Sequence, residues 1–416
     1  MFERIKKGLN NKKNINSLLI AILCMAGLIS FIININNIIP IIVVVVFIVA
    51  EIVNYNDFLK KIKSKEINIK NNLISFILLI AVLIFFVITI ANKGMKETVM
   101  QRLFYFCGFI IIPYLCCRHE ISVNKVVNYI LIISGIIAIP MFFVEWGEFS
   151  AGDRMAISYY MLPIFLAMIM NFFVDNNKSL KKNFGKIIIF LTLFYPYNDF
   201  LVKYISRGVI LAIVICIILC SIMKKSLKIK LTTIVFIILI AIVVGVFLIK
   251  PILYFTESLL SNFNIRAEVI SKSLDLIENG KFDNGRNKVF EQAINGIKEH
   301  PILGNGIGDY AEKYVTYPHN ILLQAWYEGG IVFFILMSFI LIYSLYIFIF
   351  DKNIDLEKKY LLILFFSIAI VRLMLSYEFW RETSFGLYLY IVLDAMQKKL
   401  NIRRNKKNGN SNYSNI

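Results

Sequence analysis

The chain has 416 residues, of which 58% are hydrophobic and 17% charged, and its mean hydropathy is +0.71. This composition excludes an ordinary soluble globular domain and indicates a membrane protein. The net charge of +18 is spread over polar segments between apolar runs. Membrane orientation and anionic lipid headgroups account for such a pattern, so nucleic acid is not expected as a partner.

Apolar runs of roughly 16 to 22 residues recur along the chain. At about 1.5 Å per residue, a helix of this length crosses a hydrocarbon core of about 30 Å. About twelve membrane-spanning helices are predicted, near 17–35, 38–54, 72–91, 102–117, 126–146, 155–175, 186–201, 205–223, 231–250, 325–350, 360–377 and 383–397. We therefore expect an all-α, polytopic integral membrane protein in which residues 1–416 form a single membrane domain.

The distribution of basic residues predicts the orientation in the membrane. If the N-terminus is cytoplasmic, 29 of the 45 Lys and Arg residues fall in cytoplasmic segments. Cytoplasmic loops retain positive charge, so both termini are predicted to be cytoplasmic. Residues 398–416 are basic and polar and are predicted to form a disordered cytoplasmic tail.

Cysteine and histidine usage favours neither disulfides nor a metal centre. None of the six cysteines falls in the longest polar segment, and the three histidines are far apart in the sequence. No metal site and no cofactor are therefore predicted.

The segment 251–319 is predicted to be a long extracytoplasmic loop, and long loops often carry function. Helical spacing of apolar residues in NGRNKVFEQAINGIKEHP predicts an amphipathic helix on the membrane surface, capped by Asn284 and ended by Pro301. A second helix is predicted in SNFNIRAEVISKSLDLIENG.

Three glycines follow in PILGNGIGDY. A dinucleotide-binding fingerprint would need a preceding strand and a βαβ unit, which this chain does not offer. The glycines are therefore interpreted as a turn that lets the backbone pass close to another part of the protein.

The chain then enters the membrane at YPHNILLQAWYEGGIVFF. Asn320 is predicted to cap this helix, which places His319 at the helix N-terminus, where an imidazole tends to stay neutral. Two interpretations of His319 remain open: a general base, or a structural histidine at the level of the headgroups.

Arginine departs from the distribution of lysine. Of 34 lysines 25 are assigned to the cytoplasm, whereas seven of 11 arginines are assigned to the outer side: Arg102, Arg154, Arg207, Arg266, Arg286, Arg372 and Arg381. Guanidinium suits bidentate binding of a diphosphate. The structural alternative is a salt bridge to Glu328, Glu378 or Asp199.

Three motifs carry a resemblance to a known family: SRG at 206–208, the run from Arg286 to PILGNGIGDY, and HN at 319–320 followed after nine residues by Gly330. In their order and membrane side they resemble the O-antigen ligase and O-antigen polymerase superfamily. The resemblance implies a GT-C-like fold with His319 as the base that deprotonates an acceptor hydroxyl. The predicted ligands of the departing diphosphate are Arg154, Arg207, Arg286 and, from its depth in a span, Arg372. The supporting residues are Asn320, Glu328 and Gly330.

The resemblance implies inverting, metal-independent transfer of a glycan from undecaprenyl diphosphate at the outer face of the bacterial cytoplasmic membrane. Abundant Ile, Asn and Lys suggest an AT-rich genome and favour a capsular or exopolysaccharide polymerase, which uses another lipid-linked repeat as acceptor. The alternatives are an O-antigen ligase with an acceptor such as lipid A core, and a flippase for the same lipid-linked oligosaccharide. Expected partners are the lipid-linked donor and acceptor, membrane lipids, a flippase and a chain-length regulator.

Overall fold

A computed structural model describes residues 2–33, 38–63, 73–141, 143–144, 149–174, 200, 204–223, 232, 249–262, 268–279 and 286–407, and the structural statements below concern these residues. Within them the chain is helical and contains no strand. The spans predicted at 186–201 and 231–250 lie almost entirely outside the described residues, as does the end of the tail beyond residue 407.

The first half of the chain contributes α1 (Phe2–Ile33), α2 (Ile38–Lys63), α3 (Leu73–Lys93), α4 (Glu97–Tyr105), the π-helical segment η2 (Phe106–Ile111), α5 (Ile112–Cys116), α6 (Val123–Met141), α7 (Ala151–Val174) and α10 (Arg207–Met223). The second half contributes α12 (Ile249–Ser261), α13 (Glu268–Glu278), α14 (Arg286–Glu299), α15 (Asp309–Tyr314), α16 (Ile321–Ile349), α17 (Leu356–Phe365), the π-helical η5 (Phe366–Ile370), α18 (Val371–Leu375), the short 3₁₀ segment η6 (Phe379–Arg381) and α19 (Thr383–Lys407).

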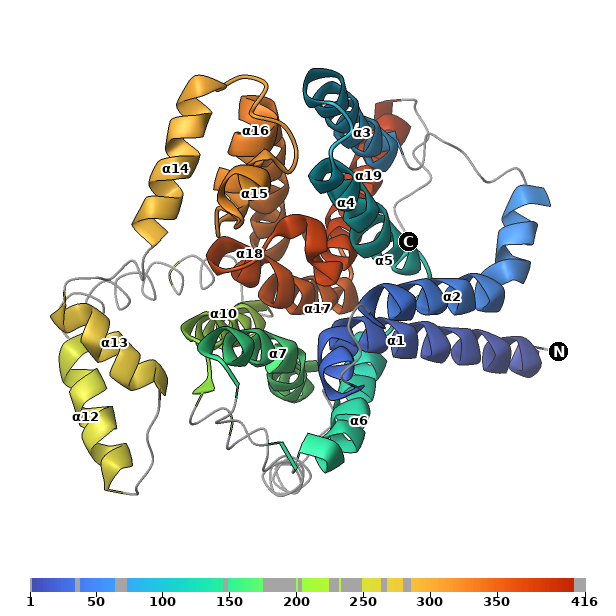
Figure 1. Cartoon of the computed structure of the whole chain (residues 1–416). Coiled ribbons are helices and arrows are strands. Elements are labelled where there is room, and N and C mark those ends of the chain that lie inside the picture. The colour runs from blue at the N-terminus through green and yellow to red at the C-terminus, as the bar shows by residue number, and fades with distance from the viewer. Residues whose placement is uncertain are drawn as a thin grey trace.

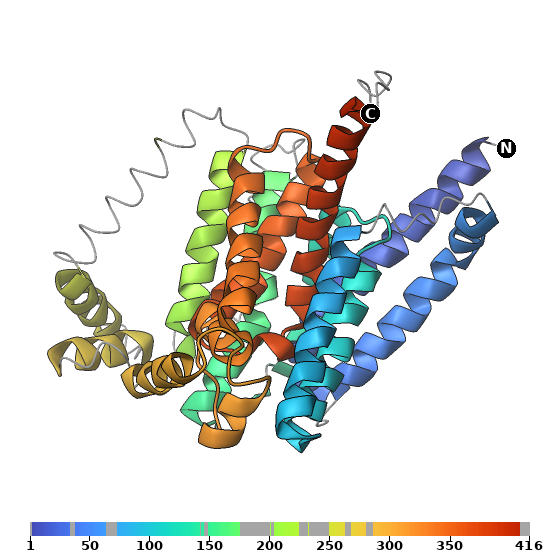
Figure 2. The same cartoon turned by 90° about the horizontal axis from the view of Figure 1, so that it is seen from above.

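The helices confirm the class predicted from the sequence, an all-α polytopic membrane protein. Among the described residues seven helical stretches are long and apolar enough to cross a membrane: Asn11–Ile33, Ile38–Asn56, Leu73–Lys93, Glu97–Cys116, Val123–Met141, Gly152–Val174 and Ile321–Ile349. The helix α10 is a shorter apolar helix. The long helices lie side by side, with the start of α1 and the end of α19 at one end of the molecule and α14 and α15 towards the opposite end, while α12 and α13 lie beside the bundle (Figure 2).

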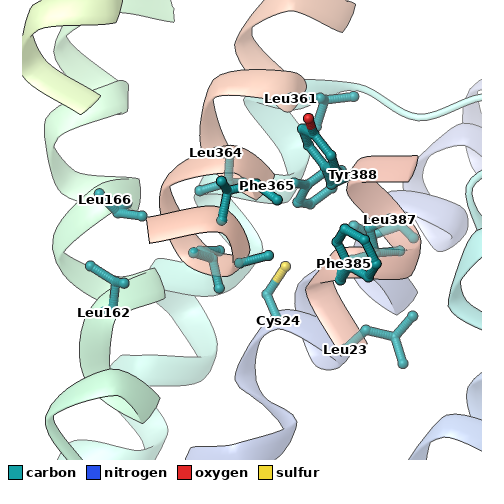
Figure 3. Packing of buried hydrophobic residues seen from close by; sticks show 14 of the residues in the cluster. Leu23, Cys24, Leu162, Leu166, Leu361, Leu364, Phe365, Phe385, Leu387 and Tyr388 are labelled. Atoms are coloured by element: carbon teal, nitrogen blue, oxygen red, sulfur yellow. The ribbon is translucent and has the colours of Figure 1, made fainter. Parts of the chain in front are cut away.

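The centre of the molecule is an apolar core built by helices that are far apart in the sequence. Leu162 and Leu166 on α7, Leu364 on α17 and Leu387 on α19 have no exposed surface. Figure 3 shows these side chains around Cys24 of α1. Such burial between helices fixes how α7, α17 and α19 sit relative to one another, and these helices carry or precede several of the predicted site residues.

Two helices predicted in the outer segment are confirmed as α13 and α14, whereas Asn284, the predicted cap, lies outside the described residues. The helix α14 was expected to lie on the membrane surface. In the structure its buried face contains Ala293, Gly296 and Ile297 and packs on α16, where a Cβ added at Gly296 would overlap the ring of Tyr327. The small side chains explain this contact, because they let two helices approach closely.

The last helix is longer than predicted. The helix α19 continues to Lys407, past residue 398, where the tail was expected to begin. No glycine or proline interrupts QKKLNIRRNKK, so nothing in this stretch ends the helix.

The helix α16 is interrupted at Gly330, where φ is 65° and ψ is −163°. At this break the chain of the glycine turn supplies backbone hydrogen bonds: Asn305 N–H donates to the Tyr327 carbonyl over 2.7 Å, and Gly306 N–H donates to the Glu328 carbonyl over 3.0 Å. A Cβ added at Gly304 would lie 2.6 Å from the Glu328 carbonyl oxygen. The interpretation of the glycines as a turn that permits close backbone approach is therefore confirmed.

The same turn is attached to the helices on its other side. Ile307 N–H donates to Thr89 Oγ1 of α3 over 3.1 Å. Asp309 forms an ion pair with Lys93 and accepts a hydrogen bond from the Tyr327 hydroxyl over 2.8 Å. These contacts hold α15 between α3 and α16, and so fix the start of the short stretch that leads to His319.

Candidate functional site

His319 lies at the entrance of α16, immediately before the residue that caps it. The side chain of Asn320 accepts hydrogen bonds from the N–H groups of Leu322 and Leu323 at 3.0 and 3.1 Å, which confirms the predicted N-cap. His319 itself has a φ of 56°, in the left-handed region. For a residue other than glycine this conformation costs on the order of 1–3 kcal/mol and persists only where the surroundings impose it.

The His319 ring lies against an aromatic ring. Its centroid lies 4.4 Å from that of Tyr317, whose hydroxyl donates to the Ser376 carbonyl over 2.8 Å. Nδ1 of His319 is buried and has no hydrogen-bond partner among the described residues. Burial, and after it the positive charge of Arg286, lowers the pKa of His319 to about 4. The imidazole is therefore neutral at neutral pH, and burial contributes most to this.

Arg207 is the first residue of α10 and is exposed. The preceding Ser206 caps this helix, because its hydroxyl accepts from Val209 N–H at 3.3 Å, while its own N–H donates to Ser158 Oγ of α7 over 2.9 Å. The start of α10 is thus held against α7. Arg286 is the half-buried first residue of α14. After burial, its positive charge is the second cause that lowers the pKa of both Arg207 and His319.

Five of the arginines that the sequence assigns to the outer side fall into two groups according to their counter-ions. No described carboxylate lies within 4.0 Å of the guanidinium of Arg207, Arg286 or Arg381. By contrast, Arg102 pairs with Glu378 at 2.9 Å, and Arg372 pairs with Glu382 at 3.0 Å. Positive charges without a carboxylate beside them are available to an anionic ligand, whereas the paired ones are already neutralised.

Arg372 occupies a closed environment. It is buried, and its guanidinium carbon lies 3.8 Å from the Tyr377 ring centroid and 5.1 Å from that of Tyr159. The predicted salt-bridge partners were Glu328, Glu378 or Asp199, but the observed partner is Glu382, because the turn after α18 returns α19 to the same level. Asp199 lies outside the described residues.

Arg154 lies in the first turn of α7. Its Nη1 donates to the Phe149 carbonyl, and its guanidinium carbon lies 5.0 Å from the ring centroid of Tyr204, three residues before Arg207. Arg154 is thereby placed next to the segment that leads into α10.

The other two supporting residues lie deeper along α16. Glu328 is buried and accepts hydrogen bonds from Gln324 Nε2 at 3.1 Å and Trp380 Nε1 at 2.7 Å. Gly330 forms the helix break. Both residues stabilise α16, the helix that His319 precedes, further from its N-terminus than the site.

Tyr317, Tyr377 and Glu382 connect the histidine with the arginines but were not predicted from the sequence. The ring centroids of Tyr317 and Tyr377 are 6.3 Å apart, and Tyr377 in turn covers Arg372. Proximity of Tyr317 to His319 in the sequence is a weak signal, because tyrosine is common at membrane interfaces in general. Glu382 has no local pattern that points to Arg372.

A comparison with known families finds a match for part of the chain. A family described as O-antigen ligase matches residues 200–338. The match contains Arg207, Arg286, the glycine turn, His319 and the break at Gly330, whereas Arg154 and Arg372 lie outside it. No match was found among curated proteins.

Proposed function

We propose that this membrane protein, whose residues 200–338 match a family described as O-antigen ligase, is a polysaccharide polymerase. It transfers a glycan chain from undecaprenyl diphosphate to a hydroxyl of another lipid-linked repeat, at the outer face of the bacterial cytoplasmic membrane. The observation that carries this proposal is the neutral histidine His319 at the entrance of α16, within the electrostatic range of Arg286. Arg286 in turn acts on Arg207, and neither arginine has a described carboxylate within 4.0 Å.

The transfer is a single displacement. As the acceptor oxygen attacks the anomeric carbon, the new C–O bond forms and the bond to the diphosphate oxygen breaks, and this oxygen leaves with the bonding electron pair. His319 takes the proton of the acceptor hydroxyl. Attack from the face opposite to the leaving group inverts the anomeric configuration.

Arg207 and Arg286 bind the diphosphate. Charge on the diphosphate grows as the glycosidic bond breaks, so guanidinium groups fixed in advance stabilise the transition state more than the bound donor. Arg154 adds a third positive charge at the start of α7, and Arg372 supports the site through Tyr377. This division of roles needs no metal, and the reaction is proposed to be metal-independent.

The polymerase is favoured over a ligase by the Ile, Asn and Lys content of the chain, which is typical of AT-rich bacteria that make capsule without lipopolysaccharide. Both activities use the same donor. They differ in the acceptor, which is a second lipid-linked repeat for the polymerase and lipid A core, or a comparable molecule, for the ligase.

The test supplies the purified protein with undecaprenyl diphosphate-linked repeat alone and resolves the products by size. A ladder of chain lengths is the expected result. Product formed only after a different acceptor is added would identify a ligase. The absence of product with every acceptor, together with movement of the lipid across vesicle membranes, would identify a flippase.

Two variants test the roles of individual residues. His319→Ala should lower the rate of ladder formation by roughly 10²–10⁴-fold, the usual contribution of a general base. His300→Ala changes an exposed histidine after α14 and should leave this rate unchanged. Arg207→Lys should weaken donor binding, since lysine keeps the charge and loses the bidentate geometry. A wild-type rate for His319→Ala would exclude the assigned base.

A further inference from the structure

The turn between α18 and α19 presents one arginine that the proposed mechanism does not use. Arg381 is exposed, and its guanidinium carbon lies 5.3 Å from the ring centroid of Tyr105 on α4. The other two arginines packed against this turn, Arg102 and Arg372, are buried and paired with Glu378 and Glu382. Within the described residues Arg381 is therefore the charge of this turn that is left without a carboxylate within 4.0 Å.

Arg381 belongs to η6, which packs against α4, whereas Arg207 opens α10, which packs against α18. The charge of Arg381 acts on both Tyr317 and Tyr377, and the charge of Arg286 acts on Tyr317 as well. Tyr317, whose ring contacts His319, is therefore within the electrostatic range of both Arg286 and Arg381. Figure 1 shows α10, which Arg207 opens, and α4, which carries the ring beside Arg381, on either side of the segment that contains α18.

We propose that Arg381, together with the ring of Tyr105, forms a second anion-binding site that holds the diphosphate of the acceptor lipid. This inference rests on the proposed polymerase, in which two molecules with a polyprenyl diphosphate must be bound at once with the base between them. A guanidinium held over an aromatic ring keeps its plane fixed and its N–H groups free for two phosphate oxygens. An acceptor anchored there would present its terminal sugar hydroxyl towards His319 while Arg207 and Arg286 hold the donor.

Binding of undecaprenyl diphosphate to the full chain tests the site directly. The protein is placed in nanodiscs of phosphatidylcholine, and the number of bound lipid diphosphates is counted by native mass spectrometry. We expect two binding events for the wild-type protein and one for Arg381→Gln, whose remaining event also shows that the variant is folded. Arg207→Gln should lose the other event, and the double variant should lose both. In each single variant, the affinity for the lipid diphosphate at the altered site should fall by about tenfold or more. This is the effect of losing a charge-assisted pair of hydrogen bonds.

Lys298→Gln is the matched control, because it removes one exposed positive charge from α14, at the same end of the molecule. It should keep both binding events. A second arm adds phosphatidylglycerol to the nanodiscs. The decisive outcome is that phosphatidylglycerol competes for the Arg381-dependent site as strongly as undecaprenyl diphosphate at the same concentration. In that case the site binds phospholipid headgroups, and the acceptor assignment is wrong.

Ladder formation is measured in parallel, so that the two proposals can fail separately. Arg381→Gln should slow ladder formation by about tenfold or more. The second site would be overturned if the wild-type protein forms a ladder but binds only one lipid diphosphate. It would also be overturned if the Arg381→Gln variant binds two. In both cases the polymerase would stand. Two binding events without any ladder would support the Arg381 site and contradict the polymerase. If Arg207→Gln and Arg381→Gln abolish the same event, the residues form one composite site and the inference is wrong.

Discussion

At the scale of single residues, His319 has an environment that limits its basicity. Its Nδ1 finds no partner among the described residues, its ring lies against Tyr317, and Arg286 adds a positive charge nearby. An imidazolium formed here would lack the carboxylate that often stabilises a catalytic histidine. The proton taken from the acceptor should therefore be passed on quickly to water or to the departing diphosphate.

The pH dependence of the reaction tests this environment. A pKa of about 4 for His319 leaves the imidazole neutral at any pH well above that value. The rate at low substrate should then fall only as the pH drops through about 4, whereas an unperturbed histidine would lose activity near 6.5.

Arg286→Gln should shift this acid limb upward, because removing the positive charge makes the imidazolium less unfavourable. The measurement is the pH profile of kcat/KM, supported by NMR titration of the three histidines, with His300→Ala to assign the exposed one. An acid limb that stays in place in Arg286→Gln would contradict the electrostatic contact between Arg286 and His319.

At the scale of elements, the break in α16 explains why the glycine turn and Gly330 occur together. A helix interrupted at Gly330 frees backbone carbonyls, and the turn returns N–H groups of Asn305 and Gly306 to two of them. The combination of φ 65° and ψ −163° at Gly330 is essentially restricted to glycine. The break and the turn are thus one structural unit that positions both ends of the stretch carrying His319.

Gly330→Ala should destabilise the protein by roughly 3 kcal/mol or more, since its Cβ would overlap the Ile302 carbonyl oxygen and its backbone conformation would be strained. Thermal unfolding in detergent measures the loss. Gly135→Ala is the control, because a Cβ at Gly135 on α6 meets nothing within 4 Å and alanine is the better helix former by roughly 0.5–1 kcal/mol. Equal unfolding temperatures for the two variants would contradict the close approach at Gly330.

At the scale of the whole molecule, buried ion pairs join segments that are far apart in the sequence. Arg102 on α4 pairs with Glu378, 276 residues later, and both side chains are under a tenth exposed. A second buried pair, between Arg372 and Glu382, is local in the sequence and closes the turn between α18 and α19. These pairs fix the position of this turn, which carries Tyr377 and Arg381.

Removing one member of the Arg102 pair should be costly. Glu378→Gln or Arg102→Met leaves a buried charge without its partner and should lower stability by roughly 3–5 kcal/mol, while Arg102→Met combined with Glu378→Met should cost far less. The comparison is a double-mutant cycle on the unfolding temperature. Additive losses in the cycle would show that the two side chains do not interact.

The arrangement of the helix ends, combined with the cytoplasmic termini expected from the distribution of basic residues, predicts the membrane topology. The start of α1 and the end of α19 lie at one end of the bundle and α14 at the other (Figure 2). A fluorescent protein that matures only in the cytoplasm should therefore fluoresce when it is fused after residue 416. A cysteine that replaces Lys298 should react with a membrane-impermeant maleimide added outside intact cells. Labelling of the Lys298→Cys variant only after lysis would reverse the predicted orientation.

The amino-acid sequence by itself determined the class of the protein and its local features. Hydropathy predicts helices from a property of each run alone, and the cap at Asn320 and the glycine turn depend on residues within a few positions. For the same reason His319 could be placed at a helix entrance before any contact was known.

Only the tertiary structure decided which arginines are neutralised and which are not. Arg102 meets Glu378 because helices from distant parts of the chain end at the same level. Arg372 meets Glu382 because of the way the turn after α18 folds back, and Arg381 meets no described carboxylate. The ring of Tyr317 between His319 and Tyr377 has the same origin. A periodic pattern along one helix contains no information about the side chains that a different helix brings to its end, so these contacts could not be predicted from the sequence.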